Sequence, residues 1–403
     1  MIFNYLARLA FTIGILLSIL SAQVLVPQVK IIDTGSRGYI NNPAWSLDSK
    51  LLAFEFKPQN ASTLIMILDV NQGISAVNLF AKPTSTSSLL VSIDKESMRL
   101  PQWSHLRANT LYILHSGNRP RLLSKIEQIS TKKIPLNTSS IKHLDKTIKQ
   151  ESQIVEYYPV KINAAEYIFA KQQNTPDMIE FTDLFGILAK LSGLKMYVDG
   201  SELIDSFSFS KLSPKFLLCK GQDNQKQIIM GKMKIHKGQL ESVDYEIIKV
   251  DKSSSSALQE PSFSPFSDHL LAYLEVSKNL QGMASYDLKI YSRNNHESYQ
   301  ITNSIYRNEE NKTSQPLSTS YAWHTIENYI FFIDKLSNRS IHYADYTDLE
   351  NIIVKELPIE LEFVENLCVS PDGKYLTAIT SSNSAPGSED ALNQMHLIML
   401  DTK

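Results

Sequence analysis

The sequence contains very little cysteine, no surplus of positive charge and, after its first residues, no long hydrophobic run. Its only cysteines, Cys219 and Cys368, are too few for a disulfide framework, so a small cysteine-stapled fold is excluded. Both lie in apolar stretches, and we expect them to be buried and unpaired. The 40 Lys and Arg against 42 Asp and Glu give a formal net charge of -2. Because no cationic excess remains to neutralise a phosphate backbone, general nucleic-acid binding is not expected.

The one long apolar stretch lies at the N-terminus. Residues 1–22 have a positive charge at Arg8, an apolar run over 9–20 and small residues up to Ala22, which is the layout of a secretory signal peptide. We predict cleavage after Ala22 and a periplasmic or secreted protein. The alternative is an uncleaved membrane anchor, since weakly apolar residues continue to Val26 and a span needs about 20 residues.

Motifs that carry catalytic or metal chemistry are missing from the sequence. It has no Gly-x-Ser-x-Gly nucleophile elbow, no His-Glu-x-x-His and no phosphate-binding loop. Three of its nine histidines, His105, His269 and His324, lie in expected turns, where solvated side chains are more common than metal ligands. The acidic pairs at 309–310 and 389–390 lie in polar, loop-like stretches. We therefore predict no catalytic residue, no metal site and no cofactor.

A weak repeat runs through almost the whole chain. Each of its seven copies has a bulky residue, a short polar turn and then an apolar strand. The bulky positions are Trp45, Trp103, Val160, Phe209, Phe263, Trp323 and Val369. Their spacings run from 46 residues (323 to 369) to 60 residues (263 to 323), which fits a unit of four strands better than a helical pair. The three tryptophans are expected to pack between units.

The strands after the turns indicate how these units are stacked. "LLAFEF", "LLAYLE" and "YIFFID" are nearly continuous apolar runs, so these strands must be covered on both faces. Sheets stacked around an axis provide such cover. We therefore predict an all-β fold, a single β-propeller over residues 23–403 with seven blades. One short helix is expected at 178–193.

The two ends of the chain are expected to close the ring. The last repeat lacks a fourth strand, whereas the strand-like segment 26–35 belongs to no repeat. Pairing them would remove an exposed sheet edge. Six blades are the alternative if the irregular repeat at Val160 is not a blade.

Three of the repeats point to a known family. "SPDGKYLTAI" (370–379), "PAWSLDSKLLAF" (43–54) and "PSFSPFSDHLLAY" (261–273) resemble the repeat of TolB-type β-propellers. In the turn of the last repeat, Pro371 presets φ and Gly373 supplies the left-handed position. The resemblance implies a propeller that binds partner proteins of the cell envelope. TolB itself has an α/β domain before its propeller, and the related prolyl-oligopeptidase-like peptidases have a hydrolase domain; neither is expected here.

Four long polar stretches are the expected binding loops. Residues 136–152, 251–259 and 303–318 would connect successive blades, and 381–393 would join the second and third strands of the last blade, so all four would lie on one face. Binding usually resides in long loops on a rigid scaffold. The predicted function is a non-enzymatic scaffold that binds a protein partner. The alternatives are a lactonase- or cyclase-like enzyme with an axial metal or acid site, and a propeller that gates a separate enzyme chain.

Overall fold

The computed structural model describes residues 27–35, 37–58, 62–79, 97–116, 122–126, 129, 141–143, 154–162, 165–172, 175–183, 204–221, 225–236, 239–278, 283–307, 320–381 and 393–400. This part of the chain is all-β and contains no α-helix. The predicted signal peptide, residues 1–22, lies outside it. Within the described ranges no helix is long and apolar enough to cross a membrane.

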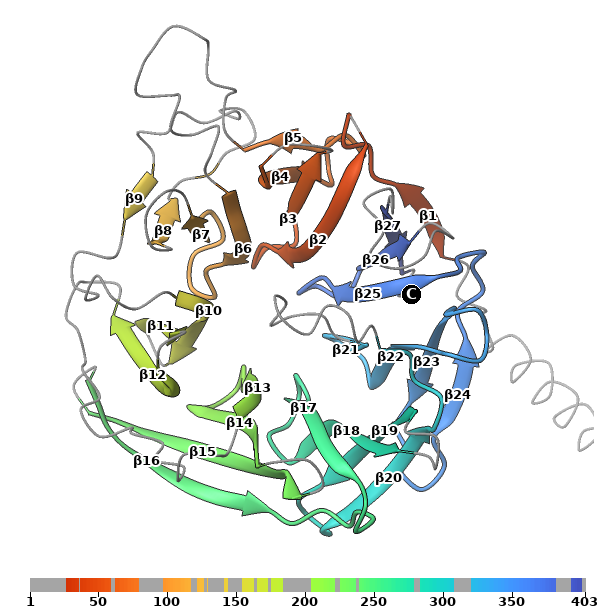
Figure 1. Ribbon diagram of the computed structural model, residues 1–403. Coiled ribbons are helices and arrows are strands. Elements are labelled where there is room, and N and C mark those ends of the chain that lie inside the picture. Colours follow the sequence, from red (N-terminus) through yellow and green to blue (C-terminus); the bar gives the residue numbers. More distant parts are fainter. Residues whose placement is uncertain are drawn as a thin grey trace, which may run out of the picture.

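Seven antiparallel sheets are arranged around a centre (Figure 1). In six of them the strands follow in chain order from the inside outward, and in the seventh the N-terminal strand β1 is the outermost. Sheet 1 consists of β2 (Gly38–Trp45), β3 (Leu51–Pro58), β4 (Leu64–Asp69) and β5 (Val77–Asn78), sheet 2 of β6 (Ser97–Trp103), β7 (Leu111–Ser116), β8 (Leu122–Ile126) and β9 (Ile141–His143), and sheet 3 of β10 (Ile154–Ile162), β11 (Ala165–Gln172) and β12 (Thr175–Asp183). Sheet 4 consists of β13 (Ile204–Phe209), β14 (Lys215–Lys220), β15 (Gln227–His236) and β16 (Gln239–Ile248), and sheet 5 of β17 (Ala257–Phe263), β18 (Leu270–Lys278), β19 (Ala284–Ser292) and β20 (Glu297–Thr302). Sheet 6 consists of β21 (Tyr321–Trp323), β22 (Tyr329–Ile333), β23 (Ile341–Asp345) and β24 (Ile353–Glu356), and sheet 7 of β25 (Val364–Val369), β26 (Tyr375–Ser381), β27 (Asn393–Met399) and β1 (Gln28–Ile31).

The repeat read from the sequence corresponds to the first hairpin of every sheet. Each bulky residue lies in the innermost strand, and the polar residues after it form the turn to the second strand. In three sheets a proline precedes the bulky residue by two positions, at Pro43, Pro101 and Pro261. The ladder between the first two strands shifts register across each of these prolines. Proline lacks an N–H, so it is tolerated where an edge strand bulges.

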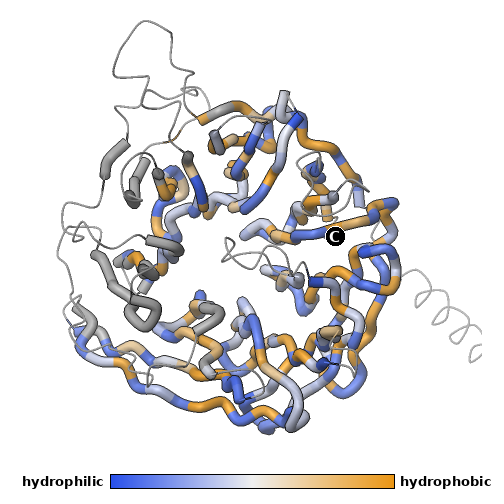
Figure 2. The backbone as a smooth tube through the Cα atoms, viewed as in Figure 1, coloured by the Kyte–Doolittle hydropathy of each residue, from blue (hydrophilic) through white to orange (hydrophobic). Residues whose placement is uncertain are grey.

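The hydrophobic core lies between neighbouring sheets and explains the continuous apolar strands. In β3, Leu52 and Phe54 pack with Ile379 of sheet 7, whereas Ala53 packs on the other side with Trp103 of sheet 2. Both faces of the strand are therefore covered, as predicted. In Figure 2 the hydrophobic residues recur along the strands of the sheets.

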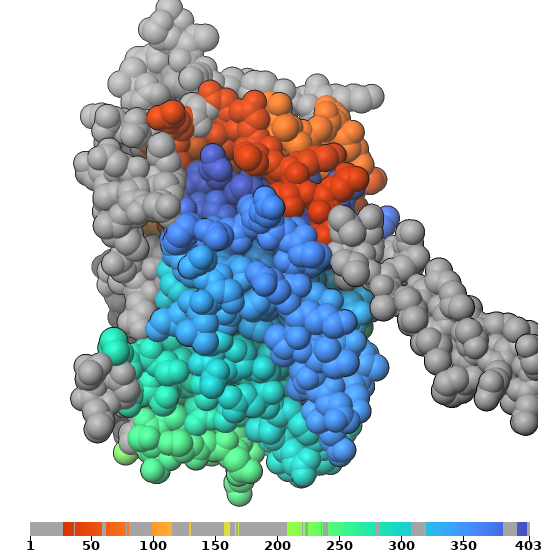
Figure 3. Space-filling view, turned by 90° about the vertical axis from the view of Figure 1, so that its right-hand side faces the viewer, coloured from red at the N-terminus to blue at the C-terminus, as the bar shows by residue number. Residues whose placement is uncertain are grey.

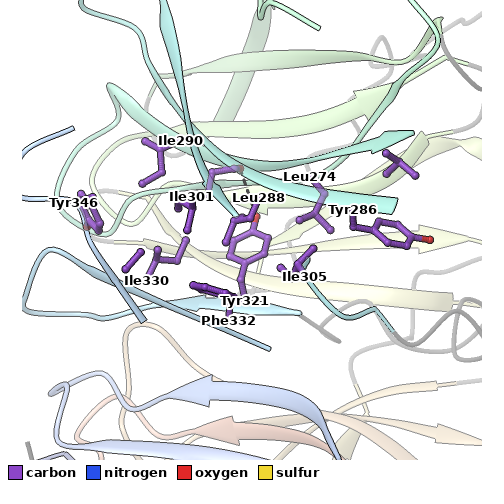
Figure 4. Close-up of a cluster of buried hydrophobic side chains, with 13 residues drawn as sticks. Leu274, Tyr286, Leu288, Ile290, Ile301, Ile305, Tyr321, Ile330, Phe332 and Tyr346 are labelled. Carbon is purple, nitrogen blue, oxygen red and sulfur yellow. Dashed lines mark hydrogen bonds between the residues drawn. The ribbon is translucent and has the colours of Figure 1, made fainter. Parts of the chain in front are cut away.

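The boundary between sheets 5 and 6 shows the same packing at close range. Leu288 and Ile290 of β19 face Tyr321 and Phe332 of sheet 6 in one cluster (Figure 4). Phe332 is 1% exposed, and burying such a side chain stabilises the fold by about 1.5–3 kcal/mol. That gain requires the neighbouring sheet, so each of the two sheets stabilises the other.

The first described strand belongs to the last sheet. β1 pairs antiparallel with β27, with Val29 opposite Ile398. The side chain of Asn393, at the start of β27, accepts a hydrogen bond from the backbone N–H of Ile40 at 2.5 Å and donates one to the Ile40 carbonyl oxygen at 2.6 Å. Residues from the two ends of the chain therefore lie against each other, red beside dark blue in Figure 3.

The third sheet differs from the prediction. The first part of the expected helix at 178–193 is wrong, because residues 175–183 form β12 and pair with β11. The ladder to β11 satisfies the backbone groups of this segment, and this outweighs the weak helical periodicity. Residues 184–193 lie outside the described ranges. In sheet 4, Tyr245 and Ile247 of the outermost strand β16 are 46% and 53% exposed.

Candidate protein-binding face

The face predicted from the sequence is only partly described. Of its four loops, 136–152, 303–318 and 381–393 lie largely outside the described ranges. The described start of 303–318 is firmly attached. Ser304 donates to Asp334, and the Arg307 guanidinium lies 2.8 Å from a carboxylate oxygen of Glu260. The base of this loop is therefore held by sheets 5 and 6, while its binding role stays a prediction.

The opposite face carries the turns between the first and second strands of the sheets, here called the inner turns. They are 46–50, 104–110, 163–164, 210–214, 264–269, 324–328 and 370–374. Residues 163–164 are not described. In five of these turns a serine follows the bulky residue, and its oxygen caps the turn. Ser210 Oγ, for example, accepts hydrogen bonds from the backbone N–H groups of Leu212 and Ser213 at 3.0 and 3.1 Å.

Hydrogen bonds join the inner turns of neighbouring sheets. Glu166 of sheet 3 accepts a hydrogen bond from the Ser104 hydroxyl at 2.6 Å and one from the His105 backbone N–H at 2.5 Å, both in sheet 2. The Asp372 backbone N–H of sheet 7 donates to Ser49 Oγ of sheet 1 at 2.9 Å. These contacts fix the turns relative to one another, so the face is rigid.

Asp268 makes the corresponding connection between sheets 5 and 4. Its carboxylate accepts hydrogen bonds from the hydroxyls of Ser210 and Ser213, and the Lys215 ammonium lies 2.9 Å from it. Burial alone would raise the pKa of Asp268, but these hydroxyls and the Lys215 ammonium hold it below its ordinary value. The aspartate is therefore charged, and its carboxylate is occupied by these contacts between sheets 4 and 5.

His324 replaces the capping serine in sheet 6, and the expectation that it is solvated is wrong. It is 1% exposed. Its Nδ1 accepts hydrogen bonds from the backbone N–H groups of Ile326 and Glu327 at 3.2 and 2.8 Å, so its Nε2 carries the proton and donates to the Gly373 carbonyl of sheet 7 at 3.0 Å. Burial lowers the pKa of His324, which keeps the ring neutral. The other two turn histidines, His105 and His269, are exposed as expected.

The inner turns expose large apolar side chains. Leu47, Leu212, Phe266 and Ile326 are 45%, 56%, 40% and 55% exposed. Leu212, Phe266 and Ile326 occupy the same repeat position, the third residue after the bulky one, in sheets 4, 5 and 6. In the turn that resembles TolB-type repeats this position is Asp372. Sheets 4, 5 and 6 therefore each have an apolar residue at the position that is aspartate in the last repeat. This difference is visible in the sequence.

Two basic side chains of this face, Lys211 in sheet 4 and His105 in sheet 2, belong to inner turns. Lys211 and His105 are exposed to solvent, but the surrounding sheets reduce their hydration. This desolvation lowers the pKa of Lys211 and lowers that of His105 to about 4.

Two further site expectations concern cysteine and metal. Neither cysteine forms a disulfide, as expected; Cys219 is buried, as expected, whereas Cys368 is only partly buried. Burial raises the pKa of the Cys368 thiol to about 11, which makes it a poor nucleophile. No group of three or more His, Cys, Asp and Glu side chains suited to a metal ion occurs among the residues that the structure describes.

Comparisons with known proteins define the fold but not a family. No protein-family model matches the chain, and no curated protein matches it. A solved structure of puromycin hydrolase is similar over 88% of this chain and 53% of that chain, with 11% identity and a TM-score of 0.53. A chain of the mitotic checkpoint complex is similar over 91% of this chain and 93% of that one, with 11% identity and a TM-score of 0.50. The structure of TolB from Acinetobacter baumannii gives 14% identity over 65% of this chain and 53% of that chain, with a TM-score of 0.37.

The class of protein follows from the ring of sheets and from these likenesses. The chain is an all-β protein with a β-propeller fold. At such low identity the likenesses extend to the fold alone. The TolB-type resemblance therefore continues to rest on the repeat sequences.

Proposed function

We propose that this chain is an exported, non-enzymatic propeller protein that binds a partner protein of the cell envelope through its inner-turn face. The observation that carries the proposal is the set of exposed apolar side chains on turns that are hydrogen-bonded to one another. Exposed apolar groups on a rigid surface mark protein interaction sites, because docking removes them from water without ordering a flexible loop. Export is supported by the signal-peptide pattern of residues 1–22.

The rigidity of this face depends on a complete ring, and we propose that the seven sheets are the seven blades of a closed propeller. The pairing of β1 with β27 supports closure, because it joins the N-terminal strand to the C-terminal sheet. The three-stranded sheet 3 supports seven rather than six blades, since the irregular Val160 repeat forms a sheet of its own. A closed ring leaves no sheet face without a neighbour.

The face is tested by affinity capture from envelope extracts with the full chain and with the double variant Phe266→Asp, Ile326→Asp. We expect the captured partner to be lost, because two carboxylates would be buried in the interface. The matched control is Leu336→Asp. Leu336 is 81% exposed but lies in the turn between the second and third strands of sheet 6, on the opposite face.

The outcomes separate the two faces. Loss of capture with the double variant and retention with the control support the inner-turn face, provided that circular dichroism shows both variants folded. Unchanged capture by the double variant would refute this face. In that case, replacing the 303–318 loop with a Gly-Ser linker tests the face predicted from the sequence.

A further inference from the structure

We propose that the outer edge of sheet 3 binds an extended, basic segment of a partner protein, which pairs with β12 as an added strand and packs on the apolar face of β16. The inference goes beyond the proposed function, because it concerns the outer rim and not the inner-turn face. It is carried by the number of strands in the sheets, by exposed apolar side chains beside sheet 3 and by the charge of β12.

Sheet 3 is one strand shorter than the others among the residues that the structure describes. The other six sheets have four strands each, whereas sheet 3 ends at β12, which pairs with β11 on one side. The N–H and C=O groups along the outer edge of such a strand can pair with an added strand. In sheet 7 the fourth position is taken by β1, which comes from the other end of the chain. The fold thus accepts a fourth strand that no hairpin supplies.

Sheet 4 directs one of its faces towards this edge. Residues that are directly opposite each other in a ladder share a face of the sheet. Four such residues follow one another across sheet 4, namely Tyr245, Gly231, Phe216 and Phe209. The Phe209 ring lies 5.7 Å from the ring of Tyr158 in sheet 3, measured between centroids. This face of sheet 4 is therefore the one beside sheet 3.

The outer part of that face is apolar and exposed. Tyr245 is 46% exposed, and Ile247, two residues further along β16 and hence on the same face, is 53% exposed. On the opposite face, Ile248 packs against sheet 5 and is 4% exposed. Because β16 is the fourth strand of sheet 4 and runs along the outer rim in Figure 1, a fourth strand of sheet 3 would lie beside it. Such a strand would remove Tyr245 and Ile247 from water.

The charge of β12 indicates which kind of strand fits. β12 contains Asp177, Glu180 and Asp183 but no Lys or Arg. Opposite charges on paired strands are stabilising, and like charges directly opposite each other are destabilising. A second copy of this chain pairing through the same edge would bring the acidic strand onto itself. The charge therefore favours a different protein, whose strand alternates Lys or Arg with apolar side chains that face Tyr245 and Ile247.

The test uses a short synthetic peptide of alternating lysine and valine, labelled with a fluorophore and titrated with the full chain. We expect binding, measured by fluorescence anisotropy, together with slower hydrogen exchange of the backbone amides of 175–183. A copy of the peptide that is methylated on its backbone nitrogens cannot donate to the edge and should not bind.

Two variants test the two chemical features of the edge. Ile247→Ser should weaken binding about tenfold, because an apolar contact is lost. Ile353→Ser is the matched control, since Ile353 is also 53% exposed but lies in β24 of sheet 6, and it should leave binding unchanged. The double variant Asp177→Lys, Glu180→Lys should prefer a peptide of alternating glutamate and valine. Circular dichroism checks that all variants are folded.

Unchanged binding by Ile247→Ser, or an unchanged peptide preference in the charge-reversed variant, would overturn the proposal. Full protection of the 175–183 amides without peptide at every protein concentration would also overturn it, because this chain would then fill the position itself. Protection that appears only as the protein concentration rises would assign the edge to a second copy instead.

The inner-turn variant Phe266→Asp, Ile326→Asp separates this proposal from the proposed function. It should bind the lysine–valine peptide as tightly as the native chain does. Loss of peptide binding in this variant would place the peptide on the inner-turn face and overturn the rim site. If affinity capture does not depend on the inner-turn face but the peptide still binds at β12, the proposed function fails and the rim site stands.

Discussion

Trp103 donates its indole N–H to the backbone carbonyl oxygen of Ala44 across the boundary between sheets 1 and 2, at 2.9 Å. A similar contact joins sheets 5 and 6, where Trp323 donates to a side-chain oxygen, Ser262 Oγ, at 2.8 Å. Ala44 and Ser262 both immediately precede the bulky residue of their repeat. The tryptophans thus join neighbouring sheets by a hydrogen bond as well as by packing.

Replacing Trp103 with Phe should lower the free energy of unfolding by about 1–2 kcal/mol, because it removes this hydrogen bond and reduces packing. Trp45→Phe is the matched control, since the Trp45 indole nitrogen is buried without a hydrogen-bond partner. Its cost should be smaller by about 1 kcal/mol. Urea unfolding followed by circular dichroism measures both; equal losses would contradict a role for the hydrogen bond.

Stability should fall when His324 is protonated. Its pKa is lowered in the folded state from an ordinary value of 6.5, so the folded protein binds fewer protons than the unfolded chain. The contribution of His324 is therefore complete above that value and is lost as the pH falls below it. Protonation of Nδ1 would also break its two hydrogen bonds from the backbone.

His324→Ser, the residue used in five other inner turns, should flatten the decline in melting temperature between about pH 7 and pH 5. His269→Ser, in an exposed turn position, is the control and should leave the profile unchanged. A His324→Ser profile identical to that of the native chain would exclude this histidine as the source of the decline.

Gly231 in β15 should not tolerate a side chain. A Cβ atom there would lie 2.2–2.7 Å from ring atoms of Phe216. The Phe216 ring also contacts Tyr245 in an edge-type arrangement, with 6.3 Å between the ring centroids. We expect Gly231→Ala to destabilise the protein by about 1–3 kcal/mol through overpacking. Thermal unfolding should show the loss reduced when Phe216→Leu is added; an equal loss in both backgrounds would contradict the clash.

Pairing of β1 with β27 should protect the last sheet. Replacing residues 28–31 with glycines should speed amide hydrogen exchange across 393–399 and increase aggregation, because the edge of β27 becomes free. The same replacement of 353–356 in β24 is the control, since this is also an exposed outer strand of four residues. It should increase exchange only in sheet 6. Equal, local effects of both changes would mean that β1 does not join the ends of the chain.

The fold was largely predictable because it depends on a repeated local pattern. The pattern of a bulky residue, a turn and a strand that is apolar on both faces recurs seven times. Each copy corresponds to a described hairpin, even at the irregular Val160 repeat. The helix expected at 178–193 failed where residues 175–183 found a ladder partner in β11. Helical periodicity within the segment did not reveal that partner, although it is the strand that directly precedes it, at 165–172.

The binding face was harder to predict because its properties arise between sheets. The sequence showed Leu212, Phe266 and Ile326 in turns, but it did not show that they are exposed. Nor did it show that Glu166 and Asp268 connect turns of neighbouring sheets by hydrogen bonds. Likewise, His324 looked like a solvated turn residue, because its acceptor, the Gly373 carbonyl, lies in the next sheet.

The sequence by itself determined the units: strands that are apolar on both faces can be stable only between neighbours, and the turn residues set where each hairpin reverses. Only the tertiary structure decided which polar groups meet across the boundaries and which turn residues stay exposed. Those properties depend on the distance between segments about fifty residues apart, and no local preference of the chain encodes that distance.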